Sequence, residues 1–285
     1  MARMVSDEIE GPSAGFGLNK PREHAGYLES GGAHLYAVLH EVAEPVARVL
    51  LAGPFAAERH FSYVPWVRWA RFLAARGIET LRFDYRGVGE STGVFEEMAF
   101  GDWMEDLELV AGWLKRRSPE APLILHGLEL GALLASKAFA GGLGDALLLW
   151  SLPANANEVM RRSLSRRIAV DQFFKSAEER KPLSAYLRQL DAGEPVEVEG
   201  YLWSGKLWRE SLRFEVPRAS PNQAETAWDD GRPLRQVILD RSAAPLVKGS
   251  SLGYIVSLNP DLNGLFSENF EWMARTVAAG YGGQQ

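Results

Sequence analysis

The stretch Gly127-Leu128-Glu129-Leu130-Gly131 decides the fold of this chain. It has the G-x-S-x-G frame of a nucleophile elbow, a sharp strand-to-helix turn, with glutamate in place of the serine. A short apolar run at residues 122–126 precedes the frame, and the helix-forming run Leu130–Ala140 follows it. The sequence therefore predicts an elbow between a strand and a helix, and the missing serine becomes the main question about function.

Strands and helices alternate on both sides of this turn. Apolar runs predict strands over residues 34–40, 46–55, 78–84, 122–126 and 146–152. Helical patterns cover residues 62–76, 102–117 and 130–140. Such alternation is typical of an α/β fold with a doubly wound, mostly parallel sheet.

The alternation stops after residue 153, and residues 155–210 are interpreted as a helical lid inserted into the sheet domain. Residues 1–30, rich in glycine, proline and charge, are expected to be irregular. The core then consists of residues 31–154 and 211–285. In its last part the pattern predicts a strand at 212–216, a helix near 222–230, a strand at 234–240 and a helix at 267–279.

Composition limits the possible functions. A net charge of −6 and a pI of about 5.5 argue against a nucleic-acid surface. The absence of cysteine excludes disulfides and thiolate metal sites. No apolar stretch approaches the roughly 20 residues of a membrane helix, and the first ten residues lack an apolar signal core. We therefore expect a cytoplasmic protein with no metal and no cofactor.

Residues 83–91, Phe-Asp-Tyr-Arg-Gly-Val-Gly-Glu-Ser, resemble the D-x-R-G-x-G-x-S segment of the α/β-hydrolase superfamily, above all its acyl-hydrolase and serine-aminopeptidase branches. The resemblance is good over residues 34–152 and loose over the rest of the chain. Residues 52–56, the elbow helix and the Gly200-Tyr201 strand also resemble the hydrolase-like proteins associated with the bacterial exosortase A (PEP-CTERM) system. This second resemblance implies a bacterial protein linked to an envelope or exopolysaccharide pathway.

The resemblance implies a catalytic triad that the residues do not supply. Superfamily hydrolysis needs a nucleophile at the elbow, then an acid, then a late histidine. The histidines lie at positions 24, 34, 40, 60 and 126, so none follows the elbow. The acid is expected after the predicted strand 212–216, where residues 217–221 contain no carboxylate. All three positions are therefore predicted to be lost.

Glu129 has two interpretations. As a carboxylate nucleophile it would still need a base, for which a displaced His60 is the candidate. As an ionised carboxylate at the start of the elbow helix, it would be stabilised there and could fill the oxyanion hole. His126, within the elbow strand, is expected to be buried and hydrogen-bonded, while Asp84 and Arg86 are expected to shape a turn.

The oxyanion hole is predicted from two backbone N–H groups. One belongs to Leu130, directly after the elbow position, and the other comes from the loop at Gly53–Phe55. If Pro54 occupies the second position, the donor is lost, because proline has no N–H. If Phe55 occupies it, the donor survives.

Arg162 and Arg166 lie four residues apart on the first predicted lid helix and therefore share a face. They are interpreted either as a solvated basic face paired with Glu158 and residues 178–179, or as an anion-binding lip.

The leading function is that of a ligand-binding or accessory protein that lacks the triad. The first alternative is an acyl-ester or thioester hydrolase that uses Glu129 and a displaced histidine. The second is a scaffold that binds a protein partner, or a second copy of the chain, through its lid.

Overall fold

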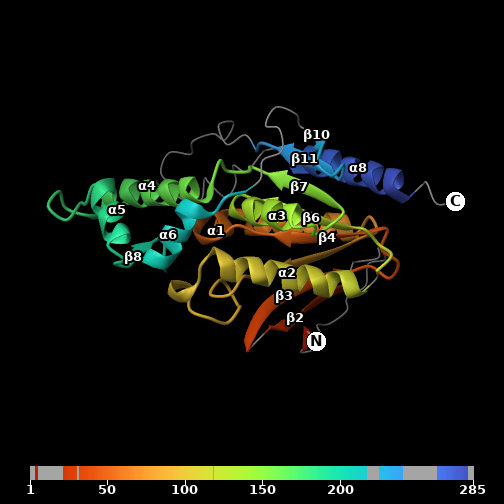
Figure 1. Cartoon of the computed structure of the whole chain (residues 1–285), viewed down its shortest axis with the longest axis horizontal. Coiled ribbons are helices and arrows are strands. Elements are labelled where there is room, and N and C mark those ends of the chain that lie inside the picture. The colour runs from red at the N-terminus through yellow and green to blue at the C-terminus, as the bar shows by residue number, and fades with distance from the viewer. Residues whose placement is uncertain are drawn as a thin grey trace.

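The fold consists of a mixed sheet, flanking helices and a helical segment at one end (Figure 1). The computed structural model describes residues 4–5, 22–30, 32–117, 119–216, 225–239 and 262–281. The strands are β1 (Met4–Val5), β2 (Arg22–Ser30), β3 (Ala33–Glu41), β4 (Ala47–Ala52), β5 (Ile78–Phe83), β6 (Leu123–Leu128), β7 (Ala146–Trp150), β8 (Val196–Val198), β9 (Tyr201–Trp203), β10 (Glu225–Ala227) and β11 (Pro233–Val237). The helices are α1 (Ala56–Ala74), α2 (Phe100–Arg117), α3 (Leu130–Ala140), α4 (Ala156–Phe174), α5 (Leu183–Asp191), α6 (Gly205–Arg213) and α8 (Leu262–Tyr281), with a 3-10 turn η1 (Phe95–Glu97).

The main sheet has the strand order β1-β2-β3-β5-β4-β6-β7-β11-β10 within the described residues. Strands β5, β4, β6, β7 and β11 are parallel, and antiparallel strands complete both edges. Leu50, Leu125 and Leu147 lie in register across three neighbouring parallel strands. The prediction of a doubly wound, mostly parallel sheet is confirmed.

Both faces of the sheet are covered, as parallel sheets require. Helices α1 and α8 pack on one face, around Trp69 and Phe266. Helices α2 and α3 pack on the other, where Leu133 is buried. Because side chains alternate along a strand, Ile124 and Leu125 of β6 enter opposite cores. None of the described helices is both long and apolar enough to cross a membrane.

The helical segment, Ala156–Arg213, lies between β7 and the last strands of the sheet. Its helices α4, α5 and α6 pack on one another and on the small β8–β9 hairpin. Helix α4 contacts α3, α6 contacts α2, and β9 contacts η1. These contacts place the segment at the end of the sheet that carries the elbow (Figure 1).

Three local expectations were wrong. Residues 22–30 form β2, although charge and glycine made the stretch look irregular; its full pairing with β3 outweighs composition. Residues 212–216 form no strand, because α6 continues to Arg213 and Leu212 is exposed. Around residues 222–230 the described part contains the short strand β10, which pairs with β11, and no helix.

The elbow glycines are required by close backbone packing. A Cβ on Gly127 would lie 2.4 Å from the Cα of Ala132, on the helix that follows the turn. A Cβ on Gly131 would lie 2.0 Å from the carbonyl oxygen of Ala52 and 2.5 Å from that of Gly53. Helix α3 therefore begins in contact with the end of β4, which fixes the position of residue 129.

Replacing Gly131 by alanine tests this packing. The added methyl group collides with backbone that cannot rotate away, so we expect a loss of about 3 kcal/mol or more in the free energy of unfolding. Gly101→Ala is the matched control, because its Cβ would meet open space on α2 and helix propensity should add up to about 1 kcal/mol. Urea unfolding followed by circular dichroism measures both variants. Equal stability of the two would contradict the proposed contact.

Candidate functional site

Glu129 occupies the elbow position and is only 2% exposed. Its backbone, with φ 54° and ψ −120°, is in a region that non-glycine residues avoid at a cost of about 1–3 kcal/mol. The side chain makes no capping hydrogen bond to α3. Instead, its Oε2 accepts a hydrogen bond of 2.5 Å from Nη2 of Arg162 on α4. An arginine of the helical segment thus covers the position of the missing nucleophile.

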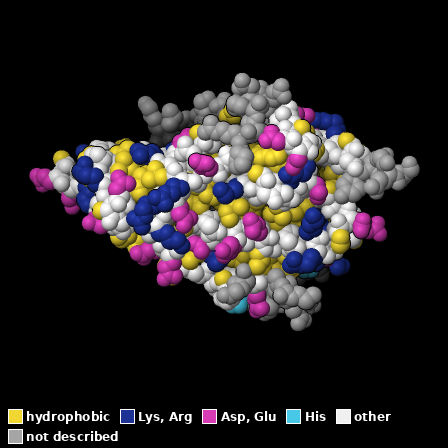
Figure 2. All heavy atoms as spheres, viewed as in Figure 1, with side chains coloured by type: hydrophobic (Ala, Val, Ile, Leu, Met, Phe, Trp, Pro, Cys, Tyr) yellow, Lys and Arg dark blue, Asp and Glu magenta, His cyan; other side chains and the backbone are white. Residues whose placement is uncertain are grey.

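The next arginine on the same face of α4 forms a second connection to the core. Arg166 Nη1 donates to Glu58 Oε1 of α1 at 2.8 Å, and its Nε donates to Glu199 Oε1 at 2.7 Å. These partners differ from the predicted ones, because Glu158 instead accepts a hydrogen bond from the N–H of Ala154 at the start of α4. Basic and acidic side chains are interleaved over this part of the surface (Figure 2). Glu58 and Glu199 were missed because nothing in their local sequence marks them as partners.

Helix α4 is positioned by its own N-terminus. Asn155 is the N-cap residue, and its side chain accepts a hydrogen bond from the N–H of Glu158 at 2.8 Å. Glu158 in turn reaches back to the residue before the cap, which resembles a capping box. The local sequence therefore starts α4 where its arginines can reach the elbow.

Aromatic side chains fill the space beside the elbow. Phe55 is 3% exposed, and its ring lies 5.4 Å from that of Trp103 and 6.4 Å from that of Trp203 in β9. Leu130, the residue after the elbow position, is also buried. Phe55 thus acts in the structure as a core residue, and whether its N–H or that of Leu130 serves an oxyanion stays a prediction.

The two candidate histidines differ in environment. His60 is exposed on α1, and its catalytic role stays a prediction. His126 is fully buried beside Trp66 and Trp150, and its Nδ1 lies 3.0 Å from the carbonyl oxygen of Leu148. Burial lowers the pKa of His126 to about 3. The expectation of a buried, hydrogen-bonded His126 is confirmed.

The D-x-R-G segment stabilises a turn, as expected. Asp84 accepts hydrogen bonds from Nε and Nη2 of Arg59 at 3.1 and 2.9 Å on one oxygen, and from Nη2 at 2.8 Å on the other. Arg86 Nε donates to Asp106 Oδ1 at 2.5 Å, and its backbone N–H donates to Oδ2 at 2.8 Å. A Cβ on Gly89 would collide with Asp84, so the turn requires glycine there.

The observed sheet changes the position at which the acid is expected. The parallel strand next to β7 is β11, Pro233–Val237, and not residues 212–216. A carboxylate does follow β11 in the sequence, namely Asp240, which lies outside the described residues. Residues 217–221 therefore give no basis for the prediction that the acid is lost. The absence of any histidine after His126 stands.

The remaining candidate ligand-binding residues lie in two different places. Gly53 lines a cavity on the α1 side of the sheet together with Pro54, whereas Arg162 and Arg166 lie over the elbow. In the described ranges, histidine, aspartate and glutamate form no cluster of three that could hold a metal ion.

The burial of His126 predicts an acid-dependent loss of stability. The folded ring stays neutral down to about pH 3, whereas the unfolded chain takes up a proton near pH 6.5. The unfolded state thus binds the extra proton, and the free energy of unfolding falls as the pH drops from 6.5 toward 3. We expect His126→Gln to reduce this slope by up to about 1.4 kcal/mol per pH unit. His40, whose pKa burial lowers to about 4, contributes equally to both proteins. Denaturant unfolding at pH 7, 6 and 5 provides the slopes, and identical slopes would refute the assignment.

Comparisons with known proteins agree with this architecture. The serine aminopeptidase (S33) family matches residues 64–146. Est1E from Butyrivibrio proteoclasticus, in its structure with bound ferulic acid, has a TM-score of 0.59 at 16% identity, over 88% of this chain and 99% of its own. Alpha/beta hydrolase domain-containing protein 10 from mouse has a TM-score of 0.56 at 15% identity, over 88% of this chain and 98% of its own. Among curated proteins, none matches this sequence. The chain therefore has the α/β-hydrolase fold, and residues 64–146 are similar to the serine aminopeptidase family.

Proposed function

We propose that this chain is a non-hydrolytic α/β-hydrolase-fold protein that acts as a ligand-binding or accessory protein. The observation that carries the proposal is the ion pair between the buried Glu129 and the partly exposed Arg162, with 2.5 Å between Oε2 and Nη2. A serine hydrolase needs an exposed, activated nucleophile at this position. In this chain the position holds a carboxylate that is covered and engaged by an arginine.

The charge at the elbow also opposes acyl transfer. A tetrahedral intermediate develops negative charge beside the nucleophile, where a hydrolase places hydrogen-bond donors. An ionised Glu129 at that place repels the developing charge. The hydrogen bond to Arg162 further reduces the electron density available for attack by the carboxylate itself. No histidine follows position 126 to act as the late general base.

The helical segment supports the same role. Residues 155–210 are proposed to act as a lid, held over the elbow by Arg162 and Arg166. The resemblance to exosortase-associated hydrolase-like proteins favours an accessory role in a bacterial envelope or exopolysaccharide-linked system. A cytoplasmic location belongs to the same proposal.

The hydrolase alternative has less support, because Glu129 contacts Arg162 and His60 is exposed.

The scaffold alternative has a specific observation in its favour. Phe173 and Phe174, at the end of α4, are each 84% exposed. Aromatic side chains are enriched at protein interfaces, so an exposed pair favours an interaction surface at this end of α4. Sedimentation over a range of protein concentrations, with Phe173→Ser/Phe174→Ser beside wild type, tests whether this surface joins two copies of the chain.

The proposed function predicts that serine-type hydrolysis is absent. Wild type should show neither turnover of short p-nitrophenyl esters nor labelling by a fluorophosphonate, because loss of triad members removes several orders of magnitude in rate. Glu129→Ser, alone or combined with Arg162→Met to uncover the position, should stay inactive without a late base. A serine esterase treated in parallel shows that the substrates and the probe work.

Two results would contradict the proposal. One is stoichiometric fluorophosphonate labelling of any serine in the wild type. The other is wild-type ester hydrolysis that disappears in His60→Ala, which would establish the hydrolase alternative instead.

A further inference from the structure

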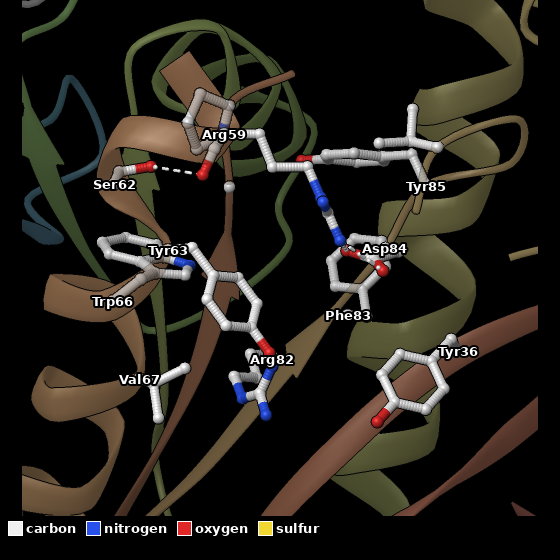
Figure 3. A pocket seen from close by; sticks show the side chains of 13 residues that line it. Tyr36, Arg59, Ser62, Tyr63, Trp66, Val67, Arg82, Phe83, Asp84 and Tyr85 are labelled. Carbon is white, nitrogen blue, oxygen red and sulfur yellow. Dashed lines mark hydrogen bonds and ion pairs between the residues drawn. The ribbon is translucent and has the colours of Figure 1, made fainter. Parts of the chain in front are cut away.

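A cavity lies on the α1 side of the sheet (Figure 3). Glu129 is not among the residues that line it. The centres of water-sized molecules fit within about 30 Å³ of it, and its whole empty space, open solvent included, is about 490 Å³. The lining comes from β3, β5, α1 and the loops after β4 and β5. It consists of Tyr36, Arg59, Tyr63, Arg82, Asp84 and Tyr85, with apolar residues between them.

One wall of the cavity is an ion pair that is already satisfied. Both oxygens of Asp84 accept hydrogen bonds from Arg59, and Oδ2 also accepts one of 3.1 Å from the N–H of Glu90. The Asp84 carboxylate thus has little capacity left for a guest. Arg59 is likewise committed, so this pair shapes the cavity and contributes no net charge to it.

Arg82 supplies a second guanidinium group to the same cavity. Its Nε is buried and has no hydrogen-bond partner within the described part of the chain. Its Cζ lies 5.6 Å from the centre of the Tyr63 ring, which keeps the guanidinium plane beside the cavity. A buried guanidinium N–H without a partner is costly, and a carboxylate binds side-on to Nε and Nη together. Arg59, Arg82 and Asp84 are the charged residues of the lining, and Glu23, outside the lining, also interacts electrostatically with Arg82. An anionic guest would add a negative partner for Arg82 inside the cavity.

Tyr85 provides an independent sign that the space suits a polar guest. The residue is 2% exposed, lines the cavity, and its hydroxyl has no hydrogen-bond partner among the described residues. Burial raises the pKa of this phenol, which keeps it protonated and able to donate. Figure 3 shows Tyr85 toward one end of the cavity and Arg82 with Tyr36 toward the other.

We propose that this cavity binds a small organic carboxylate, with the carboxylate on the guanidinium group of Arg82 and the rest of the ligand against Tyr63 at the mouth. Tyr63 is 46% exposed, which leaves its ring accessible to the apolar part of the ligand. The site extends the proposed binding role and does not depend on whether the elbow is inactive.

Benzoate is the probe, and benzamide is its neutral counterpart of equal shape. Ligand-observed NMR titration should show saturable binding of benzoate to the wild type, at a dissociation constant in the millimolar range or below. Benzamide should bind at least tenfold more weakly. Arg82→Gln should weaken benzoate binding by about tenfold or more, the usual effect of losing a charge-assisted hydrogen bond. Arg82→Lys retains the charge but not the bidentate edge, so it should also lose most of the affinity.

Arg68→Gln is the matched control, because Arg68 is an exposed arginine on helix α1 and does not line the cavity. It should bind benzoate like the wild type. Circular dichroism must show that each variant is folded before its binding is compared. Equal binding of benzoate and benzamide, unchanged binding in folded Arg82→Gln, or no saturation up to about 20 mM would overturn the site. Ester hydrolysis by the wild type would overturn the proposed function and leave this result standing.

Discussion

The close contact between the start of helix α3 and the end of strand β4 constrains the rest of the structure. Gly131 lies against the carbonyl groups of Ala52 and Gly53, so the two neighbouring parallel strands and the elbow helix have one possible arrangement. That arrangement forces Glu129 into a strained backbone conformation above the sheet. A side chain at this position has to be accommodated by whatever lies over the sheet, and in this chain that is the helical segment.

The strain and the buried charge at Glu129 explain the position of α4. Moving a carboxylate out of water is costly unless a charged partner and good geometry compensate. Arg162 supplies the partner, and Arg166 adds connections to Glu58 on α1 and to Glu199 before β9. In a hydrolase the same place must open to substrate. In this chain, arginines of α4 pair with glutamates of the elbow and of α1. The covering of the elbow is therefore part of the folded structure.

The sequence predicts the fold well where periodicity and glycine geometry act locally. The elbow, helix α3 and the alternating strands depend on neighbouring residues, and their positions agree with the structure. The prediction fails where pairing partners are distant. Residues 22–30 become a strand through β3, and the strand predicted at 212–216 put the expected acid in the wrong loop, since β11 is the strand beside β7. The partners of Arg162 and Arg166 depend on the docking of α4, which no local pattern encodes.

The short loop at Gly53–Phe55 separates the elbow from the cavity on the α1 side, and its two ends have opposite roles. Gly53 lines the cavity that Arg82 also lines, while Phe55 packs against Trp103 in the aromatic core. In α/β-hydrolases this loop supplies an oxyanion-hole donor, so it normally contacts both the bound substrate and the catalytic residues. In this chain an arginine contacts Glu129, so the side of the loop that faces the elbow is occupied. The side facing α1 retains buried polar groups without partners among the described residues, and such groups are costly unless a guest or a function compensates them. The proposed function and the proposed carboxylate site therefore assign different roles to the two sides of this loop.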